Sequence, residues 1–527
     1  MRLTTAPSRR DLLTLIGVAA GSGVMLEAMS GLGLAAESGY AGPVRLEGAP
    51  KGASVLVLGA GLAGMTAAFE LRQAGYAVRV LEYNSRPGGR NWTIRGGDRV
   101  TELGGATQVC GFDKGLYLNP GPWRISHRHR AMLDYCRRFG VALEPFTMLN
   151  YNAYLHAETA FGGQPQRIQK IRADFQGGVA ELLAKSTAQG RLDAPLTPED
   201  QEILLDAMRS WGALDKNYRY TAGDIAAGVR GFAKDPGGGL SGVPEQGQII
   251  GLGDILKSRL WQFLSIFDDY HFQASLLQPV GGMDMVGKAF AERVGDLITY
   301  NAKVTQIRQN DRHVAVTWED KAGAAETTEA DWCVCTIPLP ILNQMPLDVG
   351  PKMKAAIAAV PYANSVKIGL QFKRRFWEED DAIYGGMSFT DLAIDTIGYP
   401  NSGFNGAKGV LLGAYLWDTA AAYEMTALEP AERVRRAVAL GAKIHPQYAA
   451  EFETGIAVAW HRMPFTMGCS GDWTDEARAA HYDDLCAIDG RIVLAGEHAS
   501  YLPAWQEGAV LSALDAITRL HRRAIAA

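Results

Sequence analysis

The sequence predicts an α/β fold that begins with a Rossmann-like domain and continues through a helical insertion into further strands. Three observations support this prediction. A continuously apolar run at residues 55–58 leads into the glycines of SVLVLGAGLAG, residues 165–275 are helical by pattern, and strand-like runs follow at 302–307 and 314–318. With 527 residues, the chain is long enough for two or three domains.

Composition restricts the classes of protein to which this chain can belong. Hydrophobic residues make up 47% and charged residues 21% of the sequence, which is typical of a folded globular protein. The formal net charge of −5 gives no reason to expect a nucleic-acid partner. Six cysteines are too sparse for a disulfide framework. No Cys/His cluster has zinc spacing, so no metal site is predicted.

The stretch at residues 54–64, SVLVLGAGLAG, has the form of a buried strand that runs into a glycine-rich turn. Gly59 permits a tight turn, Gly61 lets the backbone approach a pyrophosphate, and Gly64 allows a helix to pack closely on the strand. Residues 65–74 have the composition and apolar spacing of that helix. The N-terminus of the helix offers free N–H groups and a partial positive charge to phosphates.

A second strand, over residues 77–81, ends at an acid, Glu82. Glycines, helix, strand and acid follow one another within about thirty residues, which is the length of a dinucleotide-binding βαβ unit. Glu82 would accept hydrogen bonds from the adenosine ribose, and a carboxylate there argues against the 2′-phosphate of NADP. NAD and FAD both remain open at this point.

Two further glycine-rich segments follow the acid. They are RPGGR at residues 86–90 and ELGGA at residues 102–106, and they offer another close backbone approach and a charge clamp for a pyrophosphate. With these segments the sequence resembles the flavin amine oxidase family, which includes monoamine oxidases, polyamine oxidases and L-amino acid oxidases. The resemblance implies that the cofactor is FAD. It assigns the following residues to the cofactor site: Arg86, Gly89, Arg90, Gly104, Gly105 and Ala106.

The end of the chain carries the same resemblance. Residues 495–498 (AGEH) and 505–513 (WQEGAVLSA) are similar to a family segment whose helix N-terminus faces the flavin and stabilises negative charge on it. The resemblance therefore adds Gly496, Glu497, Ala504 and Trp505 to the cofactor site. Because both ends of the chain contribute, it implies a discontinuous FAD-binding domain.

Members of this family differ in whether an arginine binds a carboxylate of the substrate. Residues 120–125 (PGPWRI) resemble the segment of L-amino acid oxidases in which an arginine grips the substrate carboxylate, with Trp123 in place of the family methionine. The resemblance gives this role to Arg124, because a planar guanidinium matches a carboxylate with two charge-assisted hydrogen bonds. The alternative for Arg124 is a surface salt bridge.

Two aromatic residues extend the predicted substrate site. Residues 396–401 (TIGYPN) resemble the family segment in which a tyrosine before proline donates its hydroxyl to the same carboxylate. This makes Tyr399 the second carboxylate ligand, with a core aromatic as the alternative. Trp505 falls where the family places an aromatic side chain beside the flavin, although the usual glycine before it is Ala504 here.

A lysine completes the predicted catalytic residues. Residues 364–370 (NSVKIGL), followed by FW at 376–377, are similar to the family strand whose lysine holds a water at the flavin and helps oxygen to react. The resemblance gives this role to Lys367. Apolar surroundings would lower the pKa of its ammonium group. The alternative is a solvated lysine at a strand edge.

Two more segments point to the flavin. Residues 460–469 (WHRMPFTMGC) fit the family segment that starts at a flavin-binding tryptophan, here Trp460. The segment ends at Cys469, where amino acid oxidases have alanine and monoamine oxidases have a cysteine linked to the flavin. Non-covalent FAD is favoured, and a covalent link at Cys469 stays open. Val304 matches a family valine whose backbone faces the adenine.

These motifs divide the chain into alternating segments. An FAD-binding domain is expected from residues 50–110, 276–342 and 481–527. A mixed-sheet substrate domain is expected from residues 111–164 and 343–480, and a helical insertion from residues 165–275. Within the insertion, helices are expected at residues 197–214, where Thr197 is the capping residue, and at 253–266.

The first residues of the chain stand apart. SRRDLL at residues 8–13 places a twin arginine before a mildly apolar, glycine-rich run at 12–36. This pattern resembles a bacterial twin-arginine export signal, so residues 1–36 are interpreted as that signal and the mature protein as periplasmic or secreted. A short membrane anchor and a disordered tail are the alternatives. No other stretch is long and apolar enough to span a bilayer stably.

The predicted function is the FAD-dependent oxidation of an L-amino acid by oxygen to the 2-keto acid, ammonia and hydrogen peroxide, as the resemblance implies. A flavin monooxygenase that converts the same substrate to an amide shares every motif. An amine oxidase without a carboxylate clamp and a flavin-binding module without turnover are further alternatives. The expected partners are the amino acid and oxygen, in a homo-oligomer expected to be a dimer. The preferred side chain stays open.

Overall fold

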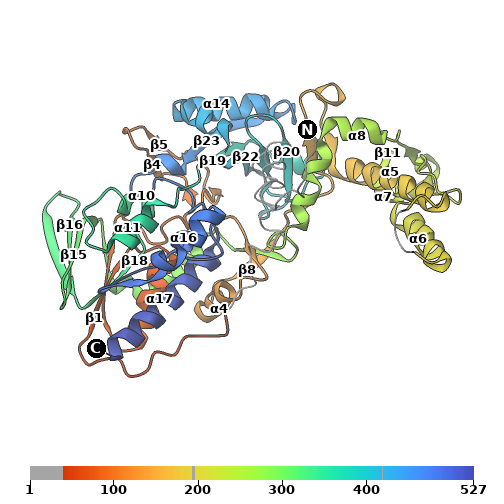
Figure 1. Cartoon of the computed structure of the whole chain (residues 1–527). Helices are drawn as coiled ribbons and strands as arrows, with labels where there is room; N and C mark the ends of the chain where they lie inside the picture. The colour runs from red at the N-terminus through yellow and green to blue at the C-terminus, as the bar shows by residue number, and fades with distance from the viewer. Residues whose placement is uncertain (1–39, 193–195, 418, 527) are drawn as a thin grey trace, which may run out of the picture.

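The computed structural model describes residues 40–192, 196–417 and 419–526. The predicted export signal at residues 1–36 lies outside these ranges. Two large sheets occupy different parts of the molecule, and a group of helices projects from one end (Figure 1). The domain boundaries proposed above stay predictions.

A six-stranded sheet contains the glycine-rich strand. Its strands, in spatial order, are β14 (Ile298–Tyr300), β2 (Ala77–Glu82), β1 (Ser54–Leu58), β18 (Trp332–Cys335), β25 (Ile492–Leu494) and β24 (Ile488–Asp489). All neighbours run parallel except β24 and β25. The sheet therefore joins strands from the start, the middle and the end of the chain, which confirms the α/β fold with a discontinuous Rossmann-like unit.

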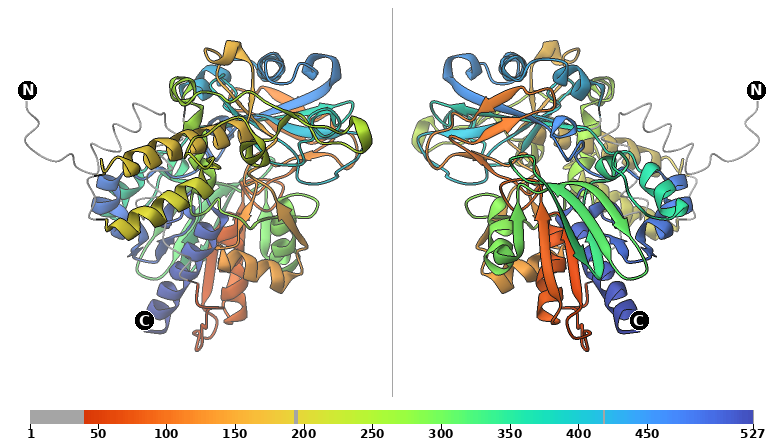
Figure 2. Two further views of the ribbon diagram at one scale, coloured as in Figure 1. Left: turned by 90° about the vertical axis from the view of Figure 1, so that its right-hand side faces the viewer. Right: turned by 90° about the vertical axis from the view of Figure 1, so that its left-hand side faces the viewer.

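All residues of β1 after Ser54 are apolar. Side chains on both faces of the strand are therefore buried in a core. Val55 and Val57 belong to one core, and Leu56 and Leu58 belong to another. The first core is covered by helices α3 (Leu62–Gln73), α4 (Arg130–Phe139), α9 (Asp284–Val294) and α17 (Gln506–Ala526), which pack on one another. Helix α17 runs along the sheet beside its red strands in Figure 2.

The second core contains an antiparallel sheet and short helices. They are β15 (Lys303–Gln309), β16 (Val314–Glu319), β17 (Ala325–Ala330), α10 (Leu339–Leu342), α11 (Pro351–Ala358) and α16 (Asp475–Cys486). The strands at 302–307 and 314–318 predicted from the sequence are thus present.

A seven-stranded mixed sheet forms the other large layer. In spatial order its strands are β10 (Gln166–Arg167), β9 (Tyr154–His156), β20 (Met387–Thr390), β21 (Thr396–Gly398), β22 (Gly409–Trp417), β19 (Ser365–Phe372) and β23 (Phe452–Ala459). Every residue of β19 is buried. The nearby helices are α12 (Phe376–Glu379), α13 (Ala420–Thr426), α14 (Pro430–Gly441) and α15 (Tyr448–Glu451). This sheet has its own core.

The helical insertion lies at the end of the molecule opposite the six-stranded sheet (Figure 1). Its helices are α5 (Ile168–Ala188), α6 (Pro198–Trp211), α7 (Asp224–Arg230) and α8 (Leu252–Ser258), with a small hairpin of β11 (Phe232–Lys234) and β12 (Glu245–Gln246). The Thr197 hydroxyl accepts from the Asp200 N–H at 3.1 Å, so the predicted cap of α6 is present. The single helix predicted at 253–266 is wrong: α8 ends because Arg259 adopts a left-handed conformation with φ 59°.

Short strands connect the two layers. They are β3 (Ile94–Arg95) with β6 (Tyr117–Leu118), β4 (Arg99–Thr101) with β5 (Thr107–Val109), and β7 (Ile125–Ser126) and β8 (Leu143–Phe146), which both pair with β13 (Leu276–Pro279). Among the residues with a described position, no helix combines the length and the apolar character that crossing a membrane requires.

Candidate active site

A cavity of about 820 Å³ is lined by residues of both large layers. Its walls include the turn after β1, the loop after β2, residues 120–124, and side chains of β19 and β22. Of the residues predicted from the sequence, those that line it are Gly59, Gly61, Glu82, Gly89, Arg90, Arg124, Val304, Lys367, Trp460, Cys469, Gly496, Glu497, Ala504 and Trp505. Six predicted residues do not line it: Gly64, Arg86, Gly104, Gly105, Ala106 and Tyr399.

The three glycines after β1 differ in the space around them. A Cβ on Gly64 would lie 1.9 Å from the Gly59 carbonyl oxygen, so only glycine lets α3 pack against this turn. A Cβ on Gly59 would lie 2.5 Å from Thr336 Oγ1. A Cβ on Gly61 would meet no atom within 4 Å, because this residue faces the cavity. Gly61 is also the N-cap of α3 and gives it no side-chain cap, so the N–H groups at the helix start are free for a ligand.

Glu82 is held in place at the end of β2. One carboxylate oxygen accepts from the Ala60 N–H at 2.6 Å, and the other accepts from the N–H and Nδ2 of Asn84 at 2.7 and 2.6 Å. Burial raises the pKa of this carboxyl, and the hydrogen bonds from Asn84 and Ala60 oppose that rise. About one accepting position remains for a ligand hydroxyl, since a carboxylate accepts about four hydrogen bonds and three are already used.

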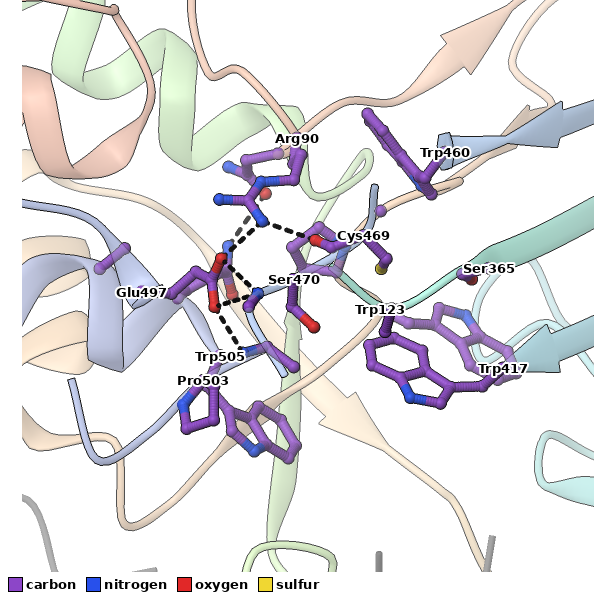
Figure 3. Close-up of a pocket in the computed structure, with 18 of the residues that line it drawn as sticks. Arg90, Trp123, Ser365, Trp417, Trp460, Cys469, Ser470, Glu497, Pro503 and Trp505 are labelled. Carbon is purple, nitrogen blue, oxygen red and sulfur yellow. Dashed lines mark hydrogen bonds and ion pairs between the residues drawn. The ribbon is translucent and has the colours of Figure 1, made fainter. Parts of the chain in front are cut away.

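An ion pair between Arg90 and Glu497 joins the two ends of the chain at the cavity (Figure 3). Arg90 Nη1 donates to Glu497 Oε1 at 2.7 Å and to the carbonyl oxygen of Cys469 at 2.6 Å. The Glu497 carboxylate also accepts from the N–H of Gly471 at 3.2 Å and of Ala504 at 3.1 Å. Burial alone would lower the pKa of Arg90, but Glu497 raises it above its ordinary value.

Arg86 does not face the cavity, and the prediction that it binds cofactor is wrong. Its Nη1 donates to the carbonyl oxygen of Gly89 at 2.8 Å, and its guanidinium lies 4.3 Å from the ring centroid of Trp92. Burial lowers the pKa of this guanidinium to about 10. Arg86 therefore shapes the loop that presents Gly89 and Arg90.

The cofactor assignment of Gly104, Gly105 and Ala106 is also wrong. These residues form the turn between β4 and β5, where Gly104 and Gly105 have φ of 93° and 90°. The preceding Glu102 is buried and accepts from Arg433 Nη2 at 2.9 Å. The glycines are thus required by a hairpin turn, because left-handed conformations favour glycine.

The glycine that makes a close approach at the cavity is Gly121. A Cβ there would lie 1.9 Å from the carbonyl oxygen of Arg90. Trp460 Nε1 donates to the Pro120 carbonyl at 2.7 Å, and Lys367 Nζ donates to the Gly121 carbonyl at 2.6 Å. Sequence reasoning singled out this segment only for Arg124. The glycine between two prolines was the available signal.

Arg124 is a buried cation without a partner in the described part of the chain. Its side chain lines the cavity, and the residue is only 9% exposed. The Nε atom has no hydrogen-bond partner, and no described carboxylate lies within ion-pair distance of the guanidinium. Its guanidinium lies 4.4 Å from the ring centroid of Phe272 and 5.6 Å from that of Trp505. Burial lowers its pKa. The surface salt bridge is therefore excluded, and a buried unpaired cation calls for an anionic ligand.

Tyr399 lies on the wrong side of β21 to bind the same ligand. Its hydroxyl is hydrogen-bonded to Ser388 Oγ at 2.7 Å and to His445 Nε2 at 2.6 Å in the core. Successive residues of a strand face opposite sides, and it is Gly398 whose Cβ would meet the Trp123 ring, at 2.0 Å. The prediction for Tyr399 is wrong because it chose a residue of the opposite face.

One tyrosine that does line the cavity, Tyr415, was not predicted from the sequence. It comes from β22, together with Trp417 two residues later, and both line the cavity. Figure 3 shows the Trp123 and Trp417 rings on one side of the cavity and Glu497 and Trp505 on the other. The alternation of Tyr415 and Trp417 at the end of an apolar run was the signal for a cavity-facing strand end.

Lys367 projects from β19 into the cavity wall. It is 2% exposed, which excludes a solvated strand-edge lysine. Its Nζ lies 4.3 Å from the ring centroid of Tyr415. Burial lowers the pKa of the ammonium to about 7, and Arg124 contributes to the same direction. The side chain can therefore hold or release a proton near neutral pH.

The remaining predicted residues also lie at the cavity. Val304 is buried at its wall. Ala504 has φ 66°, a conformation that favours glycine and explains why glycine is usual at this position. Burial raises the pKa of the Cys469 thiol to about 11, so the thiol is neutral near pH 7. Among residues with a described position, no group of three or more side chains is arranged to hold a metal ion.

Solved structures with a similar fold are amine oxidases by name. Cyclohexylamine oxidase from Brevibacterium oxydans IH-35A aligns with a TM-score of 0.59 and 16% identity over 90% of this chain and 99% of its own. Putrescine oxidase bound to putrescine aligns with a TM-score of 0.55 and 18% identity, again over 90% and 99% of the two chains. At these identities the similarity establishes the fold.

Curated relatives and a family profile extend the comparison over most of the chain. L-amino-acid oxidase of Siganus canaliculatus is 28% identical over 486 residues, covering 89% of this chain and 86% of the relative. L-amino-acid oxidase of Crotalus adamanteus is 28% identical over 488 residues, covering 89% and 87%. The profile described as flavin containing amine oxidoreductase matches residues 62–520. The chain therefore belongs to this family, and it is a flavin-dependent oxidoreductase.

Proposed function

We propose that this protein oxidises L-amino acids at the α-carbon, with FAD as cofactor and oxygen as electron acceptor, to yield 2-keto acids, ammonia and hydrogen peroxide. The observation that carries the proposal is Arg124, a buried guanidinium at the cavity that has no anionic partner among the described residues. A substrate carboxylate would supply that partner. Relatives named L-amino-acid oxidase support the same conclusion.

The cavity fits the two phosphates and the adenosine of FAD. Gly61 leaves open space beside the free N–H groups at the start of α3, where a pyrophosphate is favoured. Glu82 is oriented for the ribose hydroxyls, and Val304 lines the same cavity. Bound here, the flavin would take two electrons from the substrate and deliver them to oxygen.

The chain's own side chains would bind and orient the amino acid. Arg124 would hold the carboxylate with two hydrogen bonds and thereby fix the α-carbon. The rings of Phe272 and Trp505 beside Arg124 would exclude water. Lys367 and Arg124 both place positive charge at the cavity, which disfavours an ammonium and favours the neutral amine that oxidation requires. An amide product in place of the 2-keto acid would instead identify a decarboxylating monooxygenase.

Gly61→Ala should lower flavin occupancy without lowering the melting temperature of the flavin-free protein. The added methyl would meet no protein atom within 4 Å, but it would occupy space assigned to the pyrophosphate. We expect an occupancy well below that of the wild type, measured from flavin absorbance per protein. Gly228→Ala, where a methyl also meets nothing within 4 Å, is the control. Normal occupancy in Gly61→Ala would contradict the placement of FAD.

Purified wild-type protein can be used to test whether FAD is covalently bound to Cys469. Acid precipitation should release FAD into the supernatant, because the Cys469 thiol has a raised pKa of about 11 and thiolates are the nucleophilic form. Flavin retained in the pellet would show a covalent bond.

Arg124→Met should lower kcat/KM for amino acids by about 100-fold or more, because the substrate carboxylate would then be buried without its partner. The activity toward a matched amine without the carboxylate should not fall. Arg124→Lys should recover part of the loss, since it keeps the charge but not the fork. The exposed Arg130→Met is the control. Equal losses for the amino acid and the amine would contradict a carboxylate role.

Lys367→Met should lower kcat/KM for oxygen by about 100-fold, because a positive charge in a water-excluded site stabilises developing negative charge. With a pKa of about 7, the wild-type lysine loses its proton as pH rises through 7, so kcat/KM for oxygen should fall above this pH. The variant should show no such fall. Flavin content must be measured in parallel, since Lys367 also bonds the Gly121 carbonyl. A variant with unchanged oxygen kinetics would remove the assignment.

Export by the twin-arginine route is proposed from Arg9 and Arg10 and the mildly apolar run that follows them. Replacing both arginines with lysine should leave the protein in the cytoplasm of a bacterial host, as fractionation and immunoblotting would measure. Efficient export of this variant would contradict the proposal.

A further inference from the structure

A lone carboxylate lies on the cavity wall that the seven-stranded sheet provides. Asp395 sits in the turn between β20 and β21 and lines the same cavity as Arg124. Its backbone is fixed, because its N–H donates to the Leu392 carbonyl at 2.9 Å and its carbonyl accepts from Thr390 N–H at 2.9 Å. Its φ of 51° is a left-handed conformation that aspartate tolerates better than most residues.

The Asp395 carboxylate has no partner among the described residues. No hydrogen bond or ion pair reaches it in this part of the chain, and burial raises its pKa to about 7 with no cation to oppose the rise. The neighbouring Asp391 also lines the cavity, but its carboxylate has a partner, because it accepts from the Glu158 N–H at 2.9 Å. Asp395 is half-buried, and a carboxylate that is removed from water is costly unless a cation or hydrogen-bond donors pair with it. A ligand that covers Asp395 must therefore supply that partner.

Trp123 links the segment that carries Arg124 to the strand that follows Asp395. The Trp123 ring packs against Gly398, which belongs to β21 and comes three residues after Asp395 in the chain. Thr396, Tyr415 and Trp417 line the cavity as well. The Ile394 carbonyl accepts from the Tyr415 N–H at 3.2 Å, which places the start of the turn beside this aromatic wall.

We propose that the cavity selects L-amino acids with a cationic side chain, such as lysine, ornithine or arginine. Arg124 would hold the α-carboxylate while the side-chain cation pairs with Asp395. The methylene groups between them would lie along Trp417, whose ring also attracts a cation. This inference rests on the proposed function. It adds the substrate class, which the sequence left open.

The test compares L-lysine with L-norleucine, which lacks only the terminal ammonium group. The wild-type holoenzyme should prefer lysine by about 30-fold or more in kcat/KM, because a buried charge pair is formed only with lysine. Asp395→Asn keeps the shape and tolerates the positive φ. It should reduce kcat/KM for lysine by a similar factor, mainly through KM, while the value for norleucine changes less than about twofold.

Asp391→Asn is the matched control and should leave the ratio between the two substrates unchanged. Equal use of lysine and norleucine by the wild type, or equal losses for both in Asp395→Asn, would overturn the inference. The wild-type ratio decides the question even if the variant does not fold. Activity toward neutral amino acids without a preference for cations would reject only this inference, whereas no activity toward any amino acid would reject the proposed function.

Discussion

The partly buried ion pair between Arg90 and Glu497 is the interaction on which the cavity depends. It joins the loop after β2 to the segment before α17, which are 407 residues apart in the chain. The same two side chains hold the carbonyl of Cys469 and the N–H groups of Gly471 and Ala504. Removing either partner would leave the other charge without compensation, which is strongly destabilising when the charge is buried. Three segments of the cavity wall are thereby fixed together.

Charges that this pair does not neutralise determine the chemistry. Glu497 compensates Arg90, but Arg124 and Lys367 remain without carboxylate partners among the residues described. Both are buried, and burial lowers the pKa of each. Two buried positive groups without ion-pair partners would bind an anion and favour a neutral amine beside them, as the proposed oxidation of an amino acid requires. Asp395 supplies a negative group on the wall formed by the seven-stranded sheet, and its carboxylate has no hydrogen bond or ion pair among the described residues.

The sequence was most informative where several local signals agreed. The glycines after β1, the following helix and Glu82 form a continuous pattern, and the structure reproduces it. Arg124 and Lys367 could also be predicted, because each lies in a segment whose residues match a family segment closely. The capping residue Thr197 followed from helix-start chemistry alone.

The errors arose where a short match ignored the local geometry. The segment ELGGA at residues 102–106 contains the expected glycines. The strands before and after it pair with each other, so the segment is the turn of a hairpin. Tyr399 was predicted to bind the carboxylate because it precedes a proline. Successive strand residues face opposite sides, however, and it is Gly398 that faces Trp123 at the cavity. Gly121 and Tyr415 left only weak local signals and Asp395 left none, because their roles depend on contacts between distant segments. A single sequence does not show which distant segments meet.

The most direct test of the central claim is an anaerobic comparison on the wild-type holoenzyme. Flavin absorbance is followed after mixing with an L-amino acid or with the amine that remains when its carboxylate is removed. If Arg124 selects the carboxylate, the amino acid should reduce the flavin at least about 100 times faster at equal low concentration. Equal rates for the two compounds would contradict the account.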